Sequence, residues 1–357
     1  MHIYEYLFAA LIVVVILITS SIIASSMPAA QLSASDKEQV KTAAEKIMTQ
    51  ILLAPGQPYD WGSNTSITSQ NLQAFGLAKY GESTREAYTL DPDKVERLGF
   101  DSSNPLYIQP TVAANLMNIN TTIPELSLSN NFGFSLDIHP VLNITVYPPV
   151  NNNYNVAITS EYQVTPIANA QVDATLFFGN QGIIRVASAS NATGFDGKCT
   201  LQFGGSQPGI LTVSVTYLGI HVVEVLDFAG STKVDLLGDT LLSNSPSYGA
   251  AFSNITEIIA TQQDGRYVVS YFNSSATFDG TKYTMSFSEP SAFAFIAPSS
   301  DGSTLIFASR NINVTYSTIP NVGTSNSFAL LSYSLERTVI VRDTTCTVRL
   351  LLWRMSY

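Results

Sequence analysis

Residues 131–139, NFGFSLDIH, mark the point at which the apolar periodicity of the chain changes to two. Phe132, Phe134 and Leu136 alternate with smaller or more polar neighbours, which is typical of a strand with one buried face. The stretch LNITVY at 142–147 follows the same rule. Most of the chain beyond this point has the same character, so the sequence predicts a mainly β fold.

The polar run PPVNNN at 148–153 is the clearest linker in the chain, so we assign residues 130–153 to strands and a linker. After it, short apolar runs alternate with turn residues, which predicts one β-sandwich over residues 154–230. Its expected strands are YNVAITSEY (154–162), AQVDATLFF (170–178), GIIRVASA (182–189), CTLQF (199–203), ILTVSVTYL (210–218) and HVVEVLDF (221–228).

Residues 231–357 predict a second β-rich domain, again with short strands between Gly, Asn, Asp and Ser turns. Residues 339–341 and 345–353 form a closing hairpin in this prediction, and the last strand should lie inside a sheet because an exposed apolar edge favours aggregation. One hypothesis is that this domain shares a sheet with residues 130–148, and that the sandwich is inserted between the two.

Before these strands, residues 7–25, LFAALIVVVILITSSIIAS, contain no charge. Their length suits a transmembrane helix. A cleaved signal peptide is the alternative, with small residues at 24–26 and 29–30 as its cleavage sites, but the preceding MHIYEY has no Lys or Arg. We therefore favour a retained anchor, followed by an amphipathic helix in a unit that spans residues 1–55.

The amphipathic helix begins with a capping box at Ser35–Glu38 and ends before Pro55. Its apolar positions recur every three or four residues and pack either onto the protein's own β domain or against neighbouring copies; they are Val40, Ala43, Ala44, Ile47, Met48 and Ile51. Residues 56–129 form a connector in which Asp91 caps a short helix, DPDKVERL. Tyr59 and Trp61 are expected to seat the connector on the helix, with carbohydrate stacking as the alternative.

Charged residues make up only 12% of the chain, and the formal net charge is −10. No basic stripe is available to neutralise phosphates, which excludes nucleic acid as a partner. Seven N-x-S/T sequons follow the apolar segment and make glycosylation feasible on an extracytoplasmic face; they lie at Asn64, Asn120, Asn143, Asn191, Asn254, Asn273 and Asn313. Lys37 and Lys41 would place the same side in the cytoplasm, but large domains translocate largely regardless of charge.

The sequence predicts no enzyme, metal site or cofactor. His2, His139 and His221 have no metal-ligand spacing, and no P-loop or GxSxG elbow is present. On a strand, Asp137 and His139 would share one face, either as a carboxylate–imidazole pair or as two partly exposed residues. The two cysteines, Cys199 and Cys346, are either buried free thiols or one long-range disulfide, which an extracytoplasmic location would permit.

The glutamate at position five, the apolar helix, its amphipathic continuation and the β-rich head together resemble a type IV pilin-like protein. This resemblance covers roughly residues 3–53 and implies that Glu5 pairs with the amino terminus of a neighbouring copy during assembly. The stretches ILLAPGQPYDWGSN, FGLAKY and LDPDKVERL are similar to archaeal pilin-like, membrane-anchored surface proteins. Residues 154–229 resemble an immunoglobulin-like surface repeat, with Gly197 in a turn; such repeats act as stalks or adhesive modules.

We therefore expect a single-pass membrane protein whose β-rich domains lie outside the cytoplasm, with a structural role in an envelope or pilus-like assembly. Its expected partners are membrane lipid and copies of itself or other envelope proteins. The alternative is an adhesive or carbohydrate-binding ectodomain on a passive anchor, with surface glycans as partners.

Overall fold

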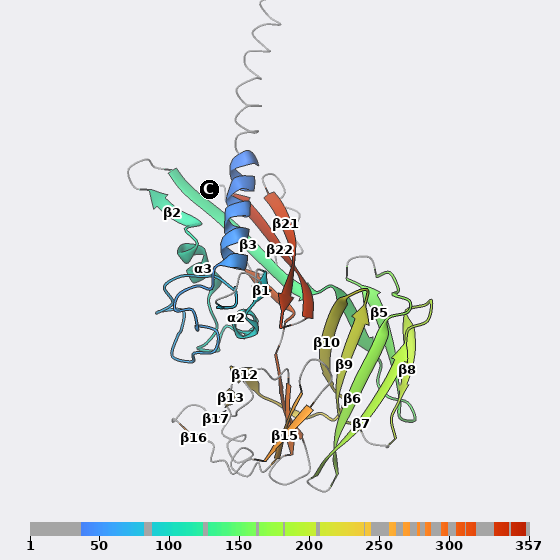
Figure 1. The fold of residues 1–357 in the computed structure, drawn as a ribbon. Helices are drawn as coiled ribbons and strands as arrows, with labels where there is room; N and C mark the ends of the chain where they lie inside the picture. The colour runs from blue at the N-terminus through green and yellow to red at the C-terminus, as the bar shows by residue number, and fades with distance from the viewer. Residues whose placement is uncertain are drawn as a thin grey trace, which may run out of the picture.

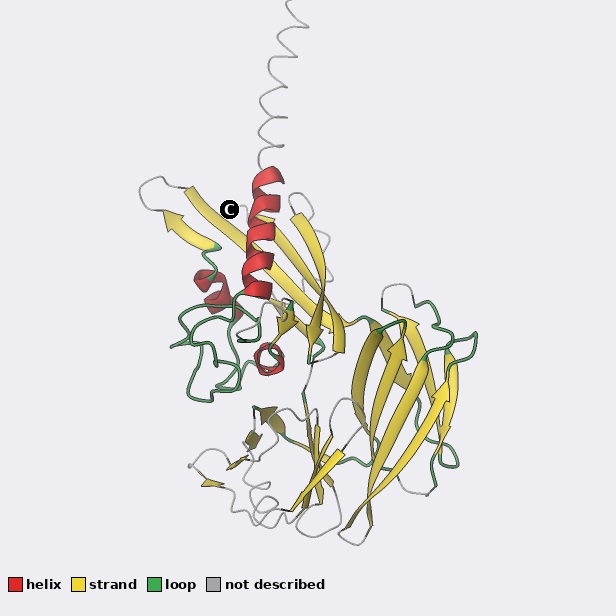
Figure 2. Cartoon of the chain, in the orientation of Figure 1, coloured by secondary structure: helices red, strands yellow, loops and turns green. Residues whose placement is uncertain are grey.

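The computed structural model describes residues 37–81, 88–123, 128–161, 164–180, 183–204, 208–238, 240–243, 257–261, 267–271, 277–278, 283–286, 294–298, 305–310, 312–318, 332–342 and 344–354. The fold is mainly β, as predicted, with several sheets and few helices (Figures 1 and 2). Within these ranges no helix is long and apolar enough to cross a membrane, and the predicted span, residues 7–25, lies outside them.

The first unit is a helix packed on an antiparallel-rich sheet (Figure 2). The helix spans residues 37–53 of the described chain. The sheet order is β1-β21-β22-β3-β2, and β20 also pairs with β3. The strands are β1 (Thr89–Leu90), β2 (Asn120–Ile123), β3 (Leu128–Pro140), β20 (Val314–Ser317), β21 (Ser332–Val341) and β22 (Thr344–Arg354). The last strand, β22, lies between β21 and β3, which confirms its predicted inner position.

The apolar stripe of the helix is buried against this sheet. Val40, Ala44 and Ile51 are at most 2% exposed and share one core with Leu136 of β3 and Leu350 of β22. Full burial of one such aliphatic side chain contributes roughly 1.5–3 kcal/mol. The sequence left two packing partners open for the stripe, the protein's own β domain and neighbouring copies. In the structure it packs on the protein's own β domain.

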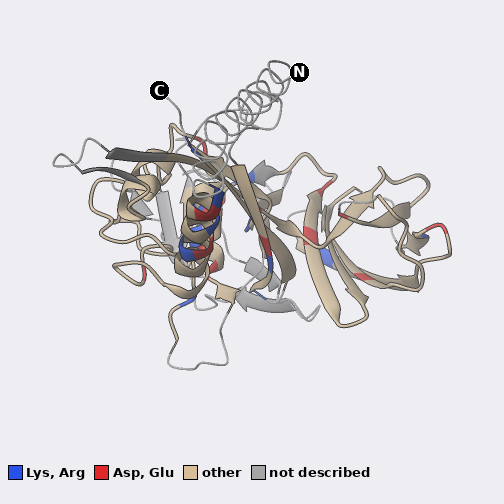
Figure 3. Ribbon diagram, turned by 90° about the horizontal axis from the view of Figure 1, so that it is seen from above, with Lys and Arg blue, Asp and Glu red and all other residues tan. Residues whose placement is uncertain are grey.

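The opposite face of the helix is polar. Lys37, Glu38, Glu45 and Lys46 are exposed there, and Lys41 lies 3.5 Å from Glu38. In Figure 3 the ribbon of this helix carries both acidic and basic positions along its length. This face therefore offers no apolar stripe for a helix of a neighbouring copy.

The connector packs into the same core. Trp61 is fully buried and its Nε1 donates to the carbonyl of Gly76 at 3.2 Å, as expected of a seating residue. Tyr59 behaves differently: it is 53% exposed and stacks on Tyr80 with a ring separation of 4.2 Å. The helices here are α2 (Pro92–Leu98) and α3 (Pro110–Leu116), and the predicted cap of α2 is confirmed because Asp91 Oδ1 accepts from the Asp93 amide at 3.0 Å.

The second unit is a seven-stranded sandwich. One sheet has the order β4-β5-β8 and the other β10-β9-β6-β7. Its strands are β4 (Leu142–Val146), β5 (Asn153–Ser160), β6 (Gln171–Asn180), β7 (Ile183–Ala192), β8 (Lys198–Gln202), β9 (Ile210–Tyr217) and β10 (Ile220–Asp227). Residues 142–146 pair with β5, so the sandwich begins at Leu142 and not at residue 154.

The third unit lies between the sandwich and the return to the first sheet. Two sheets form it, with orders β11-β19-β18-β14-β15 and β12-β13-β17-β16. The strands are β11 (Thr232–Lys233), β12 (Asp235–Leu237), β13 (Thr240–Ser243), β14 (Glu257–Thr261), β15 (Tyr267–Tyr271), β16 (Thr277–Phe278), β17 (Tyr283–Ser286), β18 (Ala294–Pro298) and β19 (Leu305–Ser309).

The sandwich ends near the boundary predicted at residue 231, since β10 ends at Asp227 and β11 begins at Thr232, but the residues that follow do not form one domain. Strands β20, β21 and β22 belong to the sheet of β3, whereas residues 232–309 build sheets of their own. Alternating side chains reveal that a segment is a strand but not which strand it pairs with. The sandwich and the third unit are therefore both inserted between β3 and β20.

Apolar contacts join the three units. Phe177 and Ile210 of the sandwich share a core with Ile296 and Phe307 of the third unit. Leu106 of the connector packs with residues of the third unit, namely Leu237 and Leu242.

Candidate functional site

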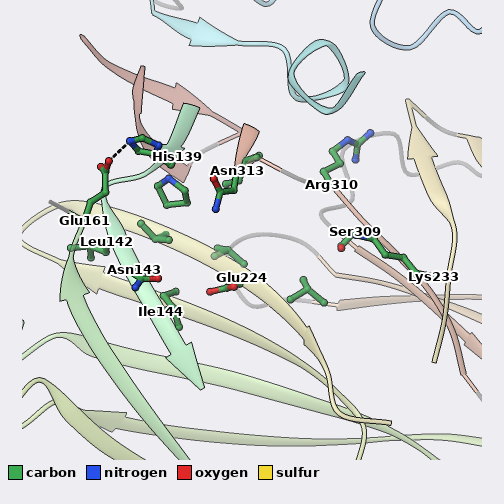
Figure 4. A pocket seen from close by; sticks show the side chains of 15 residues that line it. His139, Leu142, Asn143, Ile144, Glu161, Glu224, Lys233, Ser309, Arg310 and Asn313 are labelled. Atoms are coloured by element: carbon green, nitrogen blue, oxygen red, sulfur yellow. Dashed lines mark ion pairs between the residues drawn. The ribbon is translucent and has the colours of Figure 1, made fainter. Parts of the chain in front are cut away.

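A cavity of 610 Å³ lies where the three units meet (Figure 4). The end of β3 and the start of β4 supply one wall, β10 supplies another, and the segments around β11 and between β19 and β20 supply the third. Its polar lining residues are His139, Asn143, Glu161, Glu224, Lys233, Ser309, Arg310 and Asn313. A mixed polar and apolar concave site of this size is typical of small-molecule pockets.

His139 and Glu161 form an ion pair at one end of the cavity, drawn as the dashed line in Figure 4. His139 is the last residue but one of β3, and Glu161 directly follows β5, so the pair bridges the first sheet and the sandwich. A pair with Asp137 was one of the two interpretations of His139 from the sequence. In the structure the imidazole pairs with Glu161. Sequence spacing could not identify this partner, because it belongs to another sheet.

Glu224 lies on β10 between Val223 and Val225 and faces the same cavity. Burial raises the pKa of its carboxyl to about 7. Among the described residues, no cation forms an ion pair with it. Near neutral pH this carboxyl is therefore divided between a form that donates a hydrogen bond and a form that only accepts.

Arg310 contributes to the wall, but its guanidinium is held by protein groups. Its Nε and NH2 lie 2.9 and 2.8 Å from Asp93 Oδ1, and NH2 also donates to the carbonyl of Gly238 at 2.8 Å. Lys233, by contrast, is exposed at the wall. The cavity can thus hold a small polar ligand through Glu224, Lys233 and the amide side chains. No group of three His, Cys, Asp or Glu side chains in the described ranges is placed to hold a metal ion.

The cysteines lie in separate cores. Cys346 of β22 belongs to the helix–sheet core and Cys199 of β8 to the sandwich core, and both are free. The proposed long-range disulfide between them is therefore not formed. Burial raises the pKa of the Cys199 thiol to about 11 and that of Cys346 to about 12.

The sequons fall into different environments. Asn143 and Asn313 are exposed and line the cavity. Asn191 is exposed, and its Nδ2 donates to the carbonyl of Thr200 at 2.9 Å. The amide group of Asn64 is engaged on both sides: Nδ2 donates to Asp60, and Oδ1 accepts from Ser66.

The side chains of four predicted site residues are not described. Glu5, Asn254 and Asn273 fall on residues whose placement is not described. Asn120 begins β2, but its side chain is likewise not described.

No protein-family model matches the chain, and no curated protein matches it significantly. Among solved structures, one neighbour is the C-terminal 282-residue fragment of intimin, crystallised with the intimin-binding domain of the translocated intimin receptor. It is 14% identical, the match covers 55% of this chain and 67% of the fragment, and the TM-score is 0.16. A similarity this low carries no argument about fold or function.

Proposed function

We propose that this protein is a membrane-anchored, extracytoplasmic surface protein with a structural role in a cell-envelope or pilus-like assembly. The observation that carries the proposal is the helix at residues 37–53, which buries its apolar stripe on an antiparallel sheet of its own chain. The β-rich head is thereby fixed to the helix that follows the apolar segment at residues 7–25. In this proposal the seven-stranded sandwich is an immunoglobulin-like module displayed by that head.

The burial of the stripe restricts where copies can meet. The described helix turns a polar face outward, so contacts between copies fall to the apolar segment that precedes it. Glu5 stands at the start of that segment, and a carboxylate beside an apolar helix is costly unless it is paired. Pairing of Glu5 with the amino terminus of a neighbour would supply that partner.

The test compares Glu5→Ala with Glu38→Ala in the full-length protein in its native membrane. Glu38 is an exposed carboxylate on the outer face of the helix, so its variant controls for loss of a negative charge. We expect Glu5→Ala to abolish crosslinked oligomers or filaments while the protein remains in the membrane fraction, and Glu38→Ala to leave assembly intact. Unchanged assembly in Glu5→Ala would make the anchor a passive one.

The second candidate is an adhesive or carbohydrate-binding ectodomain. The stacked pair Tyr59 and Tyr80 favours it, because both residues are more than half exposed and aromatic faces suit sugar stacking. A glycan-binding screen of the detergent-solubilised full chain tests it. Binding that is lost in Tyr80→Ser but kept in Tyr147→Ser, where an exposed tyrosine of the sandwich is removed, would favour adhesion over a purely structural role.

A further inference from the structure

Three loops at one end of the sandwich each present a large apolar side chain to solvent. Val164 lies between β5 and β6, Phe195 between β7 and β8, and Leu218 between β9 and β10. They are 74%, 96% and 85% exposed, more than any other large apolar side chain of the described residues. Single exposed apolar side chains are ordinary, but three on neighbouring loops indicate a contact surface.

The backbone makes two of these residues more unusual. Val164 and Leu218 have φ values of 49° and 48°, in the left-handed region that favours Gly and Asn. Leu218 and Gly219, the latter at φ 83°, form a two-residue hairpin turn, for which Asn-Gly is the favoured pair. A two-residue turn does not require Leu at position 218, and exposure to water favours neither Leu nor Val. Residues in such strained backbone conformations cluster at functional sites.

Strand pairing and hydrogen bonds hold the three loops together at one end of the sandwich. Gln171 at the start of β6 pairs with Thr216 of β9 and with Ala192 of β7, so the loops are neighbours. Thr193 binds the β5–β6 loop through its backbone and side chain: its carbonyl accepts from the Asn169 amide at 2.9 Å, and its hydroxyl donates to the Ile167 carbonyl at 2.6 Å. The apolar tips therefore project from a hydrogen-bonded base.

These highly exposed tips suit a medium that accepts side chains without a matching pocket. The lipid bilayer around the expected anchor is such a medium. It would lie close to the head, because only residues 26–36 separate the apolar segment from the helix. In Figure 1 the loop end of the sandwich faces the same way as the residue-37 end of that helix. The charged groups of these loops are few, namely Glu161, which pairs with His139, and Asp196.

We infer that Val164, Phe195 and Leu218 insert into the interface of the lipid bilayer that holds the anchor. The inference rests on the proposed membrane anchor. A tethered head has a high effective concentration at the membrane, so weak insertion of three side chains suffices to hold it there. The sandwich would then form a second contact with the bilayer and lay the head along it.

The experiment places a tryptophan at Phe195 in the full-length protein reconstituted into phosphatidylcholine vesicles. The control is Ile183→Trp, because Ile183 is 60% exposed at the opposite end of the same sandwich. Both native tryptophans, Trp61 and Trp353, are buried and common to the two variants. Doxyl-labelled phosphatidylcholine should quench Phe195→Trp at least about twofold more than Ile183→Trp, because quenching requires contact with lipid. Adding Val164→Asn and Leu218→Asn should reduce that difference.

Equal quenching of the two tryptophans, with the protein floating with the vesicles, overturns the inference while the anchor stands. A concentration-dependent blue shift of Phe195→Trp in detergent, with no lipid quenching in vesicles, overturns it in favour of a contact between copies. Failure to float with the vesicles overturns the proposed anchor itself.

Discussion

Asp93 and Arg310 form a buried ion pair between positions 217 residues apart in the chain. Asp93 lies in α2 of the connector, and Arg310 lies where the chain passes from β19 to β20. Their side chains are 11% and 1% exposed, and Arg310 also donates to Gly238 of the third unit. One guanidinium thus ties the third unit to the first.

Removal of the charge on Asp93 should destabilise the protein strongly. Asp93→Asn removes the negative charge that lies 2.8 Å from the buried guanidinium, and loss of one partner of such a pair costs about 3–5 kcal/mol. Urea unfolding measures the change in the free energy of unfolding. The control is Glu336→Gln, which breaks an exposed contact with Arg349 at 3.8 Å and should cost less than about 1 kcal/mol.

The double variant Asp93→Leu/Arg310→Met separates pairing from packing. It removes both charges of the pair and should recover much of the loss, because neither Asp93 nor Arg310 is then left as a buried charge without the other. Equal losses in Asp93→Asn and Glu336→Gln would contradict a structural role for the buried pair.

Glu224 should make the stability of the protein fall as pH rises. Burial raises its pKa to about 7 in the folded state, above its ordinary value of 4.5, so the folded state binds the proton more tightly. This contribution is fully present below pH 4.5 and is lost as pH rises through 7. Glu224→Gln should therefore flatten the stability profile between these pH values and stabilise the protein at pH 8 by at most about 3 kcal/mol.

Denaturant unfolding over pH 4–8 checks this, with Asp173→Asn on the exposed face of β6 as the control. His139, Glu161, Lys233 and Arg310 line the same cavity and are unchanged in the variant, so the difference between variant and parent isolates Glu224. A constant difference at every pH would contradict the prediction.

Leu218→Asn should stabilise the fold although it removes a large side chain. Leu218 is exposed and stands at a positive φ, which Asn adopts more readily, so a gain of about 0.5–1 kcal/mol is expected. Thermal unfolding measures it. Leu218→Ser, which is polar but lacks that preference, should give a smaller gain, and a loss of stability in Leu218→Asn would show that the leucine packs in the folded protein.

The two thiols should resist modification in the folded protein. Burial raises both pKa values well above neutral, to about 11 for Cys199 and about 12 for Cys346, and the thiolate is the reactive form. Maleimide at pH 7.5 should label neither cysteine of the native protein, and should label both after unfolding without a reductant. Labelling after unfolding that appears only with a reductant would mean that the two are oxidised.

Sequon use should follow side-chain access. Glycopeptides are expected at Asn143 and Asn313, both exposed at the cavity, and not at Asn64, whose amide group binds Asp60 and Ser66. Mass spectrometry of peptides from protein purified from its native membrane, before and after deglycosylation, measures each position. A glycan at Asn64 with none at Asn143 would contradict the assignment.

Local patterns in the sequence determined the elements and the polarity of their faces. The period-two alternation of Phe132, Phe134 and Leu136 specified a strand with one buried face, and Asp91 before Pro92 specified the start of α2. The three- and four-residue spacing from Val40 to Ile51 specified one apolar face of a helix. Each of these properties depends on side chains within a few residues of one another, so the sequence alone is sufficient to predict them.

Only the tertiary structure decided which elements meet. Residue 132 pairs with residue 354, Arg310 reaches Asp93, and His139 takes Glu161 rather than the nearby Asp137. The same folding keeps Cys199 and Cys346 in separate cores and closes the cavity around Glu224. These contacts depend on the burial of complementary surfaces from distant segments, and no local pattern records which distant surface a given face will cover.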